Sequence, residues 1–226
     1  MSPPDEGAEE RSPRPRLAAQ LAAVVSAIDD ELAAANVARE VALAACRSTI
    51  RASGSSIRAV HRMDHETAAT LAQQAEAALR QAQRALAPHP PVAHAGFLHD
   101  AEKEYVEARA LAALVHADPV PGPDELGVSP TAWMRGLAEA ASELRRHLLD
   151  RLREGHLDRG EELLATMDAV YGALVVVDHP DALTDGLRRT LDALRAVLER
   201  TRGDVTSLVL QVRLQRALER ATGAGS

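Results

Sequence analysis

A long segment without proline, residues 16–87, is the feature that most constrains how this chain folds. Apolar residues recur through its first half mostly at steps of three and four: Leu17, Leu21, Val24, Val25, Ile28, Leu32, Ala35, Val37, Val41 and Leu43. This spacing places the side chains along one face of an α-helix. Proline returns at Pro88, where it ends a helix because it has no backbone N–H to donate. The segment therefore predicts long helices that pack through an apolar face.

The composition extends this expectation to the rest of the chain. Alanine and leucine supply most of the 46% hydrophobic fraction, and aromatic residues make up only 2%. Such a composition favours helices over sheets, and alanine-rich faces let helices approach closely. The 226 residues suffice for one domain with its own core. We predict an all-α, single-domain bundle of six or seven helices over residues 16–222, preceded by a disordered, proline-rich tail over residues 1–15.

Capping residues and prolines give the expected helix boundaries. Asp64 and Ser129 are of the type that caps a helix N-terminus, and Pro130 suits the first helical position. The Ser53-Gly54-Ser55-Ser56 run is expected either to kink the first helix or to let another chain approach it. The expected helices cover about residues 16–62, 65–87, 92–116, 130–153, 158–177 and 184–222.

Charge and cysteine content exclude several classes of protein. The net charge of −7 gives no overall basic surface for nucleic acid, although a local basic stripe remains compatible with it. The single cysteine, Cys46, rules out an intrachain disulfide and is expected to be buried. No apolar run approaches the length of a membrane span, and the N-terminus has no apolar core of a signal peptide. We expect a cytosolic protein without a membrane partner.

Two pairs of glutamates carry the clearest chemical signal. Glu104 and Glu107 lie three residues apart in one expected helix, and Glu139 and Glu143 lie four apart in the next. Residues at these spacings share one face of a helix. Since the connection between the two helices is short, they are plausible antiparallel neighbours. If their acidic faces meet, four carboxylates converge.

Convergent carboxylates are hard oxygen ligands of the kind that Mg²⁺ or Mn²⁺ prefers. Such an ion can activate water and neutralise a scissile phosphate. The same glutamates can also simply face water, as most glutamates on helices do. Among helical metal proteins, the ferritin-like class requires Glu-x-x-His pairs, which this chain lacks. An all-α nucleotide pyrophosphatase, which also uses acidic pairs, remains open on pattern alone.

A row of arginines precedes the acidic pairs. Arg47, Arg51, Arg58 and Arg62 step by 4, 7 and 4 residues, so a continuous helix would place them in a narrow arc, with His61 beside them. The planar guanidinium group binds phosphate through two parallel hydrogen bonds. We take these five residues as a candidate nucleic-acid contact that reads no sequence. The alternative is a solvated helix face that pairs with acids elsewhere.

From about Cys46 to Leu214 the chain resembles the translin family. The resemblance rests on Glu104-Tyr-Val-Glu-Ala108 and on Gly136-Leu-Ala-Glu-Ala-Ala-Ser-Glu-Leu144, which look like the nuclease subunit, translin-associated factor X. It also rests on Ser56-Ile-Arg-Ala-Val-His-Arg62 and on Thr201-Arg-Gly-Asp204, the latter as in prokaryotic members. These motifs occur in the order that the family shows.

The resemblance implies an all-α fold that assembles as an octameric shell and binds RNA and single-stranded DNA inside. It also implies a Mg²⁺-dependent endoribonuclease whose acidic residues match Glu104, Glu107, Glu139 and Glu143, the third often being aspartate in the family. A closed shell would reconcile a basic interior with an acidic whole. We therefore expect a homo-octameric, Mg²⁺- or Mn²⁺-dependent endoribonuclease that cleaves single-stranded RNA. A non-catalytic module that binds RNA or single-stranded DNA is the alternative within the family.

Overall fold

The computed structural model describes residues 14–93 and 96–223, and every regular element within them is a helix. The all-α prediction is confirmed. Six of these helices are long and three, α3, α5 and α8, are single turns. In chain order the helices are α1 (Arg14–His61), α2 (His65–Leu86), α3 (Pro90–Ala93), α4 (Phe97–His116), α5 (Pro123–Leu126), α6 (Pro130–Arg153), α7 (Leu157–Leu174), α8 (Asp181–Thr184) and α9 (Leu187–Gly223). A disordered tail was predicted over residues 1–15, and residues 1–13 lie outside the described part of the chain. Helix α1 begins at Arg14, two residues earlier than expected.

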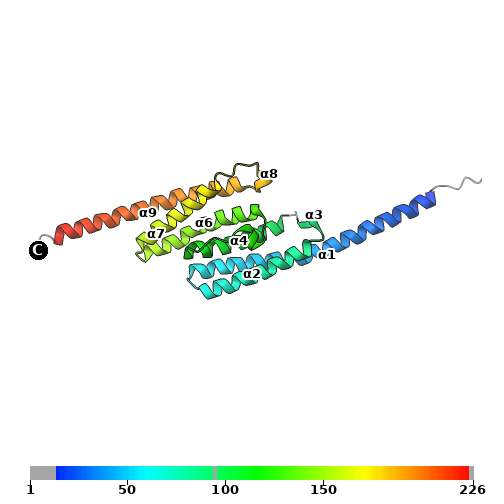
Figure 1. Ribbon diagram of the computed structural model, residues 1–226, viewed down its shortest axis with the longest axis horizontal. Coiled ribbons are helices and arrows are strands. Elements are labelled where there is room, and N and C mark those ends of the chain that lie inside the picture. The colour runs from blue at the N-terminus through cyan, green and yellow to red at the C-terminus, as the bar shows by residue number, and fades with distance from the viewer. Residues whose placement is uncertain (1–13, 94–95, 224–226) are drawn as a thin grey trace, which may run out of the picture.

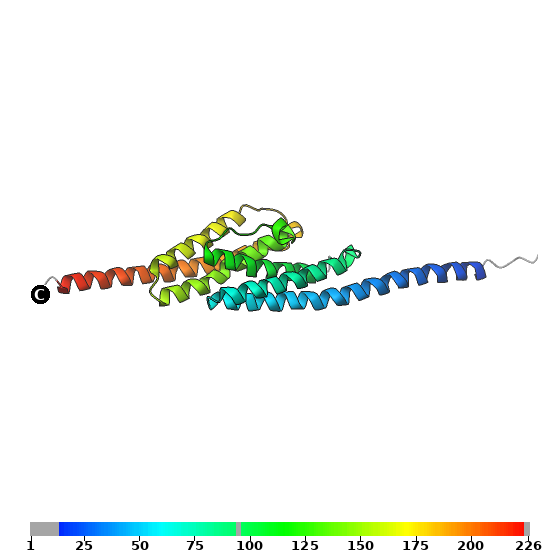
Figure 2. The ribbon, with the colours of Figure 1, turned by 60° about the horizontal axis from the view of Figure 1, so that its bottom comes forward.

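The long helices form an elongated bundle (Figure 1). The C-terminal half of α1 packs against α2 and α4, α4 packs against α6, and α6 packs against α7 and α9. The N-terminal part of α1 and the C-terminal part of α9 project from opposite ends of the bundle (Figures 1 and 2). None of the described helices combines the length and the apolar composition that a membrane crossing requires.

The serine-rich run in α1 does not interrupt the helix. The backbone stays α-helical through residues 53–56, and the run faces a neighbouring helix of the same chain. The Ser56 hydroxyl is buried and donates to the Ala68 carbonyl of α2 at 2.8 Å. Thr49, two turns earlier, donates to its own helix at Ala45 and to Ala75 of α2. Ser56 and Thr49 thus satisfy their hydrogen bonds while α2 approaches closely, whereas the buried Ser53 hydroxyl has no hydrogen-bond partner among the described residues.

Three predicted helix boundaries are wrong. The helix expected from residue 92 is divided, because the backbone turns through a positive φ of 91° at Gly96 before α4 begins. The last helix starts at Leu187 rather than residue 184, because Asp185 and Gly186 both adopt positive φ and end α8. Helix α7 stops at Leu174, three residues early. The two predicted caps are confirmed: Asp64 accepts from the Thr67 amide, and Ser129 accepts from the Ala132 amide.

Two apolar clusters hold the bundle together. One joins α1, α2 and α4 around the fully buried Tyr105, and the other joins α4 and α6 with α7 and α9 around Leu144 and Met167. The half-buried Trp133 packs against both clusters. Cys46 is buried in the first cluster, as predicted, and this burial raises the pKa of its thiol to about 11. Its thiol is therefore protonated at neutral pH and packs as a small apolar group.

Candidate metal centre

The close approach of α4 and α6 is set by Gly136. A Cβ atom at this position would lie 2.6 Å from the Lys103 carbonyl oxygen and 2.7 Å from the Val106 Cβ atom. Real Cβ atoms essentially never come that near another heavy atom. Glycine therefore lets the backbone of α6 rest directly on α4. The contact lies one turn before Glu139 on α6 and beside Glu104 on α4, so it brings the two acidic faces together.

Three of the four predicted acidic ligands converge across this contact. Carboxylate oxygens of Glu104, Glu107 and Glu139 all lie within 4.8 Å of one another, and all three residues are partly buried. This is the one such group of side chains that could hold a metal ion among the described residues. The structure therefore brings together three of the four glutamates that the helical spacing singled out, drawn from two helices.

Lys103 lies among these carboxylates. Its ammonium group donates to Glu104 at 3.2 Å and to Glu139 through a shorter hydrogen bond, and its side chain is 13% exposed. Burial acts to lower the pKa of Lys103, but the two carboxylates together outweigh it and hold that pKa above its usual value. Sequence reasoning did not assign a role to this residue. The available signal was that Lys103 is the single lysine of the chain and adjoins a predicted ligand.

Glu107 is the carboxyl group of the cluster with a strongly raised pKa. Burial raises its pKa to about 8, and repulsion from Glu104 and Glu139 adds to the shift. Lys103 opposes the rise but does not cancel it. Glu107 is therefore mostly protonated at neutral pH when no further cation is present. The proton on Glu107 shows that Lys103 alone does not neutralise the three carboxyl groups of the cluster.

Glu143 has a different partner. Its carboxylate bonds the Nε2 atom of His61 at 2.7 Å, and this bond is the first cause of the lowered pKa of Glu143. The His61 side chain is only 3% exposed, and its Nδ1 atom has no hydrogen-bond partner among the described residues. The prediction groups His61 with the arginines as a nucleic-acid contact, but the structure turns it inward toward the acidic faces. Glu143 lies outside the three-carboxylate group, and its role as a fourth metal ligand stays a prediction.

The arginines of the predicted row lie on the exposed side of α1. Arg47, Arg51 and Arg58 are exposed, and Arg62 follows directly after the last residue of the helix. Arg51 and Arg58 each donate to a serine hydroxyl three residues earlier. Within the described residues, none of the four pairs with a carboxylate. Their guanidinium groups are therefore available to an anionic partner.

A polar groove of about 440 Å³ adjoins Glu143 on α6. Its basic residues are Arg145, Arg146 and Arg153. Arg145 is bonded to Asp204 and Arg153 to Asp150, whereas Arg146 is exposed and pairs with no described carboxylate. Arg146 is thus an exposed basic group in the same groove as Glu143. No periodic pattern in the sequence marks it.

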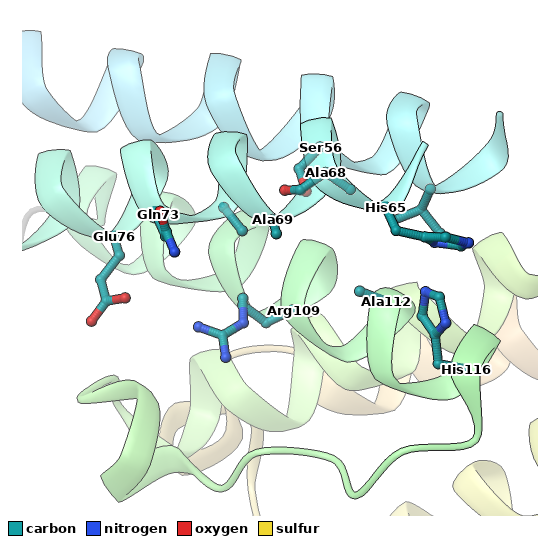
Figure 3. A pocket seen from close by; sticks show the side chains of 11 residues that line it. Ser56, His65, Ala68, Ala69, Gln73, Glu76, Arg109, Ala112 and His116 are labelled. Carbon is teal, nitrogen blue, oxygen red and sulfur yellow. The ribbon is translucent and has the colours of Figure 1, made fainter. Parts of the chain in front are cut away.

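A separate cavity of about 390 Å³ lies between α2 and α4 (Figure 3). At one end the rings of His65 and His116 meet edge to face, with their centres 4.2 Å apart. Gln73, Glu76 and Arg109 lie toward the other end. None of the four predicted acidic ligands lines this cavity. The candidate centre is therefore the carboxylate cluster and not the cavity.

The fold has been observed before in solved structures. AfC3PO in complex with duplex RNA superimposes with a TM-score of 0.76 and is 30% identical, over 83% of this chain and 97% of that chain. The crystal structure of AfC3PO superimposes with a TM-score of 0.77, at the same identity and the same coverage of both chains. The chain belongs to the translin/C3PO family. This confirms the resemblance noted in the sequence.

A further solved structure and one sequence relative are also similar to the chain. Apo-NeC3PO superimposes with a TM-score of 0.74 at 19% identity, over 81% of this chain and 96% of that chain. An uncharacterized protein of Methanocaldococcus jannaschii, MJ0175, is 30% identical over 126 residues, which is 55% of this chain and 56% of that protein. The aligned region thus spans little more than half of that relative. No family model matches the chain.

The family-like motif Thr201-Arg-Gly-Asp204 joins α9 to the rest of the bundle. Thr201 and Asp204 both accept hydrogen bonds from Arg145 of α6. Arg202 donates both to Asp168 of α7 and to Glu199 of its own helix. The motif thus fixes α9 against the helix that carries Glu139 and Glu143. Its contacts indicate a structural role in this translin/C3PO protein.

Proposed function

We propose that this chain is a Mg²⁺- or Mn²⁺-dependent endoribonuclease of the translin/C3PO family that binds and cleaves single-stranded RNA. The observation that carries the proposal is the convergence of Glu104, Glu107 and Glu139 within 4.8 Å. The duplex RNA bound by the related AfC3PO supports RNA as the partner. Single-stranded DNA is a second candidate ligand, as the family resemblance implies.

The donor set fits a hard divalent cation. All three converging groups offer carboxylate oxygens, which are the ligands that Mg²⁺ and Mn²⁺ take in proteins. A bound cation of this kind lowers the pKa of water and offsets the charge of a scissile phosphate. Glu104, Glu107 and Glu139 would hold it, and Glu143 would complete the set from the same face of α6. The proton retained by Glu107 indicates that the cluster can accept further positive charge.

Lys103 has two roles in this scheme. Without a metal ion its ammonium group bridges Glu104 and Glu139 and limits their repulsion. On metal binding it would release these carboxylates, and its charge would then be free to contact a phosphate of the substrate. His61 would keep the Glu143 carboxylate oriented through the 2.7 Å bond.

Arginines on two helices would hold the RNA. Arg146 is exposed beside Glu143, and Arg58 is exposed one turn before His61. Both can bind phosphate oxygens without reading the bases. Arg47, Arg51 and Arg62 would extend this contact along α1. A homo-octameric shell, as the family resemblance implies, would enclose these residues and leave the acidic surface outside.

The test is cleavage of a labelled single-stranded RNA and of a duplex RNA in Mg²⁺. We expect cleavage of the single strand by the wild type and its loss in Glu139→Ala. Glu161→Ala, which removes an exposed glutamate of α7, is the matched control and should cleave normally. Equal cleavage by Glu139→Ala and wild type would exclude the catalytic assignment. RNA binding without cleavage by the wild type would support the non-catalytic alternative, and release of pyrophosphate from nucleotides would support a pyrophosphatase.

A further inference from the structure

The first part of α1 extends beyond the bundle. Helix α1 is 48 residues long, yet every side chain described from Pro15 to Ala34 is exposed. Figures 1 and 2 show this part, residues 14–34, projecting past the end of α2. We call it the α1 arm. Nothing in the described chain covers it.

The α1 arm carries an apolar stripe. Six large side chains that are each 50–63% exposed form it: Leu17, Leu21, Val24, Val25, Ile28 and Leu32. At 3.6 residues per turn they fall within about 100° of the helix circumference. The stripe is in line with Ala42 and Cys46, which α1 buries inside the bundle. The arm thus continues a packing face beyond the helices that cover it, and such a face marks a contact with another chain.

The order of the stripe residues identifies the partner. The steps from Leu17 to Leu32 are four, three, one, three and four residues, so the stripe reads the same in both directions. Two antiparallel copies would therefore place Leu17 opposite Leu32, Leu21 opposite Ile28 and Val24 opposite Val25. Every large residue meets one of similar size across a twofold axis, as an isologous interface requires.

The charges of the arm agree with this arrangement. Arg16 lies near its start, and Asp29, Asp30 and Glu31 lie near its end. An antiparallel pair brings the arginine of one arm near the acidic run of the other. A parallel pair would instead place the two acidic runs side by side, where they repel.

We propose that two copies of this chain pair through their α1 arms as an antiparallel helix pair, centred between Val24 and Val25. The C-terminal part of α9, which also projects from the bundle, fits the stripe less well. Its exposed residues Leu210, Leu214 and Leu218 are spaced by four and four, so they do not match the stripe. The pairing concerns the α1 arm alone and does not rest on the proposed ribonuclease function.

Disulfide cross-linking of the full-length protein tests the pairing. A Leu17→Cys chain and a Leu32→Cys chain, co-expressed with different tags, are oxidised together. In the antiparallel pair Leu17 of one copy faces Leu32 of the other, within the roughly 7 Å that a disulfide allows between Cα atoms. Leu17 of one copy then lies about 22 Å along the helix axis from Leu17 of the other copy, at 1.5 Å per residue. The native Cys46 is buried and should not react.

We expect the mixed dimer, which joins a Leu17→Cys chain to a Leu32→Cys chain, to be at least ~10-fold more abundant than dimers of either variant alone, because only the mixed pair satisfies the disulfide distance. Adding Ile28→Glu to both chains should abolish it, since an unpaired charge enters the apolar seam. Val37→Glu is the matched control: Val37 is 65% exposed on the other side of α1, and the cross-link should persist.

Three results would overturn the proposal. Self-cross-linking of Leu17→Cys alone would show a parallel pair, and absence of any cross-link would show that the arms do not meet. Preferential cross-linking of Leu17→Cys to Leu214→Cys would show that the projecting part of α9 occupies the stripe. RNA cleavage measured on the same variants reports separately on the ribonuclease.

Discussion

Gly136→Ala perturbs the contact on which the candidate metal centre depends. The added Cβ atom would lie 2.6 Å from the Lys103 carbonyl oxygen, whereas ordinary contacts begin at 3.4 Å. The difference, 3.4 minus 2.6, is 0.8 Å, and the nearest atom belongs to the backbone of α4 and cannot rotate away. Helices α4 and α6 must therefore move apart by several tenths of an ångström at the acidic faces.

The effect of Gly136→Ala on stability is the balance of two opposing effects. Overpacking of a core typically costs about 1–3 kcal/mol, and the rigid backbone contact places this case at the upper end. Replacing glycine by alanine within a helix stabilises the folded state by about 1 kcal/mol. We therefore expect the free energy of unfolding to fall by about 2 kcal/mol. In a domain of this size that corresponds to a Tm lower by about 4–8 °C.

The same substitution should weaken metal binding. Separation of α4 from α6 moves Glu139 away from Glu104 and Glu107, and changes of this kind around a metal site typically cost about 10–100-fold in affinity. Urea unfolding and calorimetric titration with Mn²⁺ measure the two effects. Gly172→Ala is the matched control, because a Cβ there meets nothing within 4 Å. If Gly136→Ala unfolded at the wild-type urea concentration and bound Mn²⁺ equally well, the role of this contact would be refuted.

Three further predictions concern the groups around the cluster. Lys103→Gln removes the cation that competes for Glu104 and Glu139, so Mn²⁺ affinity measured by calorimetry should rise about tenfold, or about 1.4 kcal/mol; weaker binding would contradict the competition. Because the pKa of Glu107 is about 8 in the fold and about 4.3 when unfolded, the folded state binds more protons between these values, and the metal-free stability should fall as pH rises from about 4.5 to 8. The free energy of unfolding, measured by urea in the presence of a chelator, should fall with pH in this way for the wild type and less steeply for Glu107→Gln. Parallel pH profiles of the two proteins would exclude Glu107 as the group responsible. His61→Phe leaves Glu143 without its 2.7 Å partner and should cost about 1–3 kcal/mol of stability in the same assay, while His156→Phe, at an exposed histidine, should be neutral.

Periodicity and capping residues predicted most of the bundle. Proline-free apolar repeats and the caps at Asp64 and Ser129 depend on neighbours within one turn, so they could be read from the sequence. The boundaries at Gly96 and Asp185 could not, because positive φ at these residues depends on how the following helix docks. The continuity of α1 through Ser53–Ser56 depends on α2, which accepts the Ser56 hydroxyl bond.

Helical spacing in the sequence predicted one part of the candidate site, the faces that carry the glutamates. The helical spacing of the glutamates identified the faces that meet, and three of the four carboxylates converge. The bond between His61 and Glu143 joins residues 82 positions apart, which no local pattern encodes. The rotamer that places Lys103 between Glu104 and Glu139 is likewise a tertiary property, since a lysine beside a glutamate on a helix usually extends into solvent.

The central claim is that Glu104, Glu107 and Glu139 together bind a divalent cation. A crystal structure of the protein grown in Mn²⁺, with an anomalous difference map, tests it most directly. We expect a Mn²⁺ peak in contact with all three carboxylates and the Lys103 ammonium group released from Glu139. A map without a peak between α4 and α6, with Lys103 still bonded to Glu139 at saturating Mn²⁺, would contradict the account.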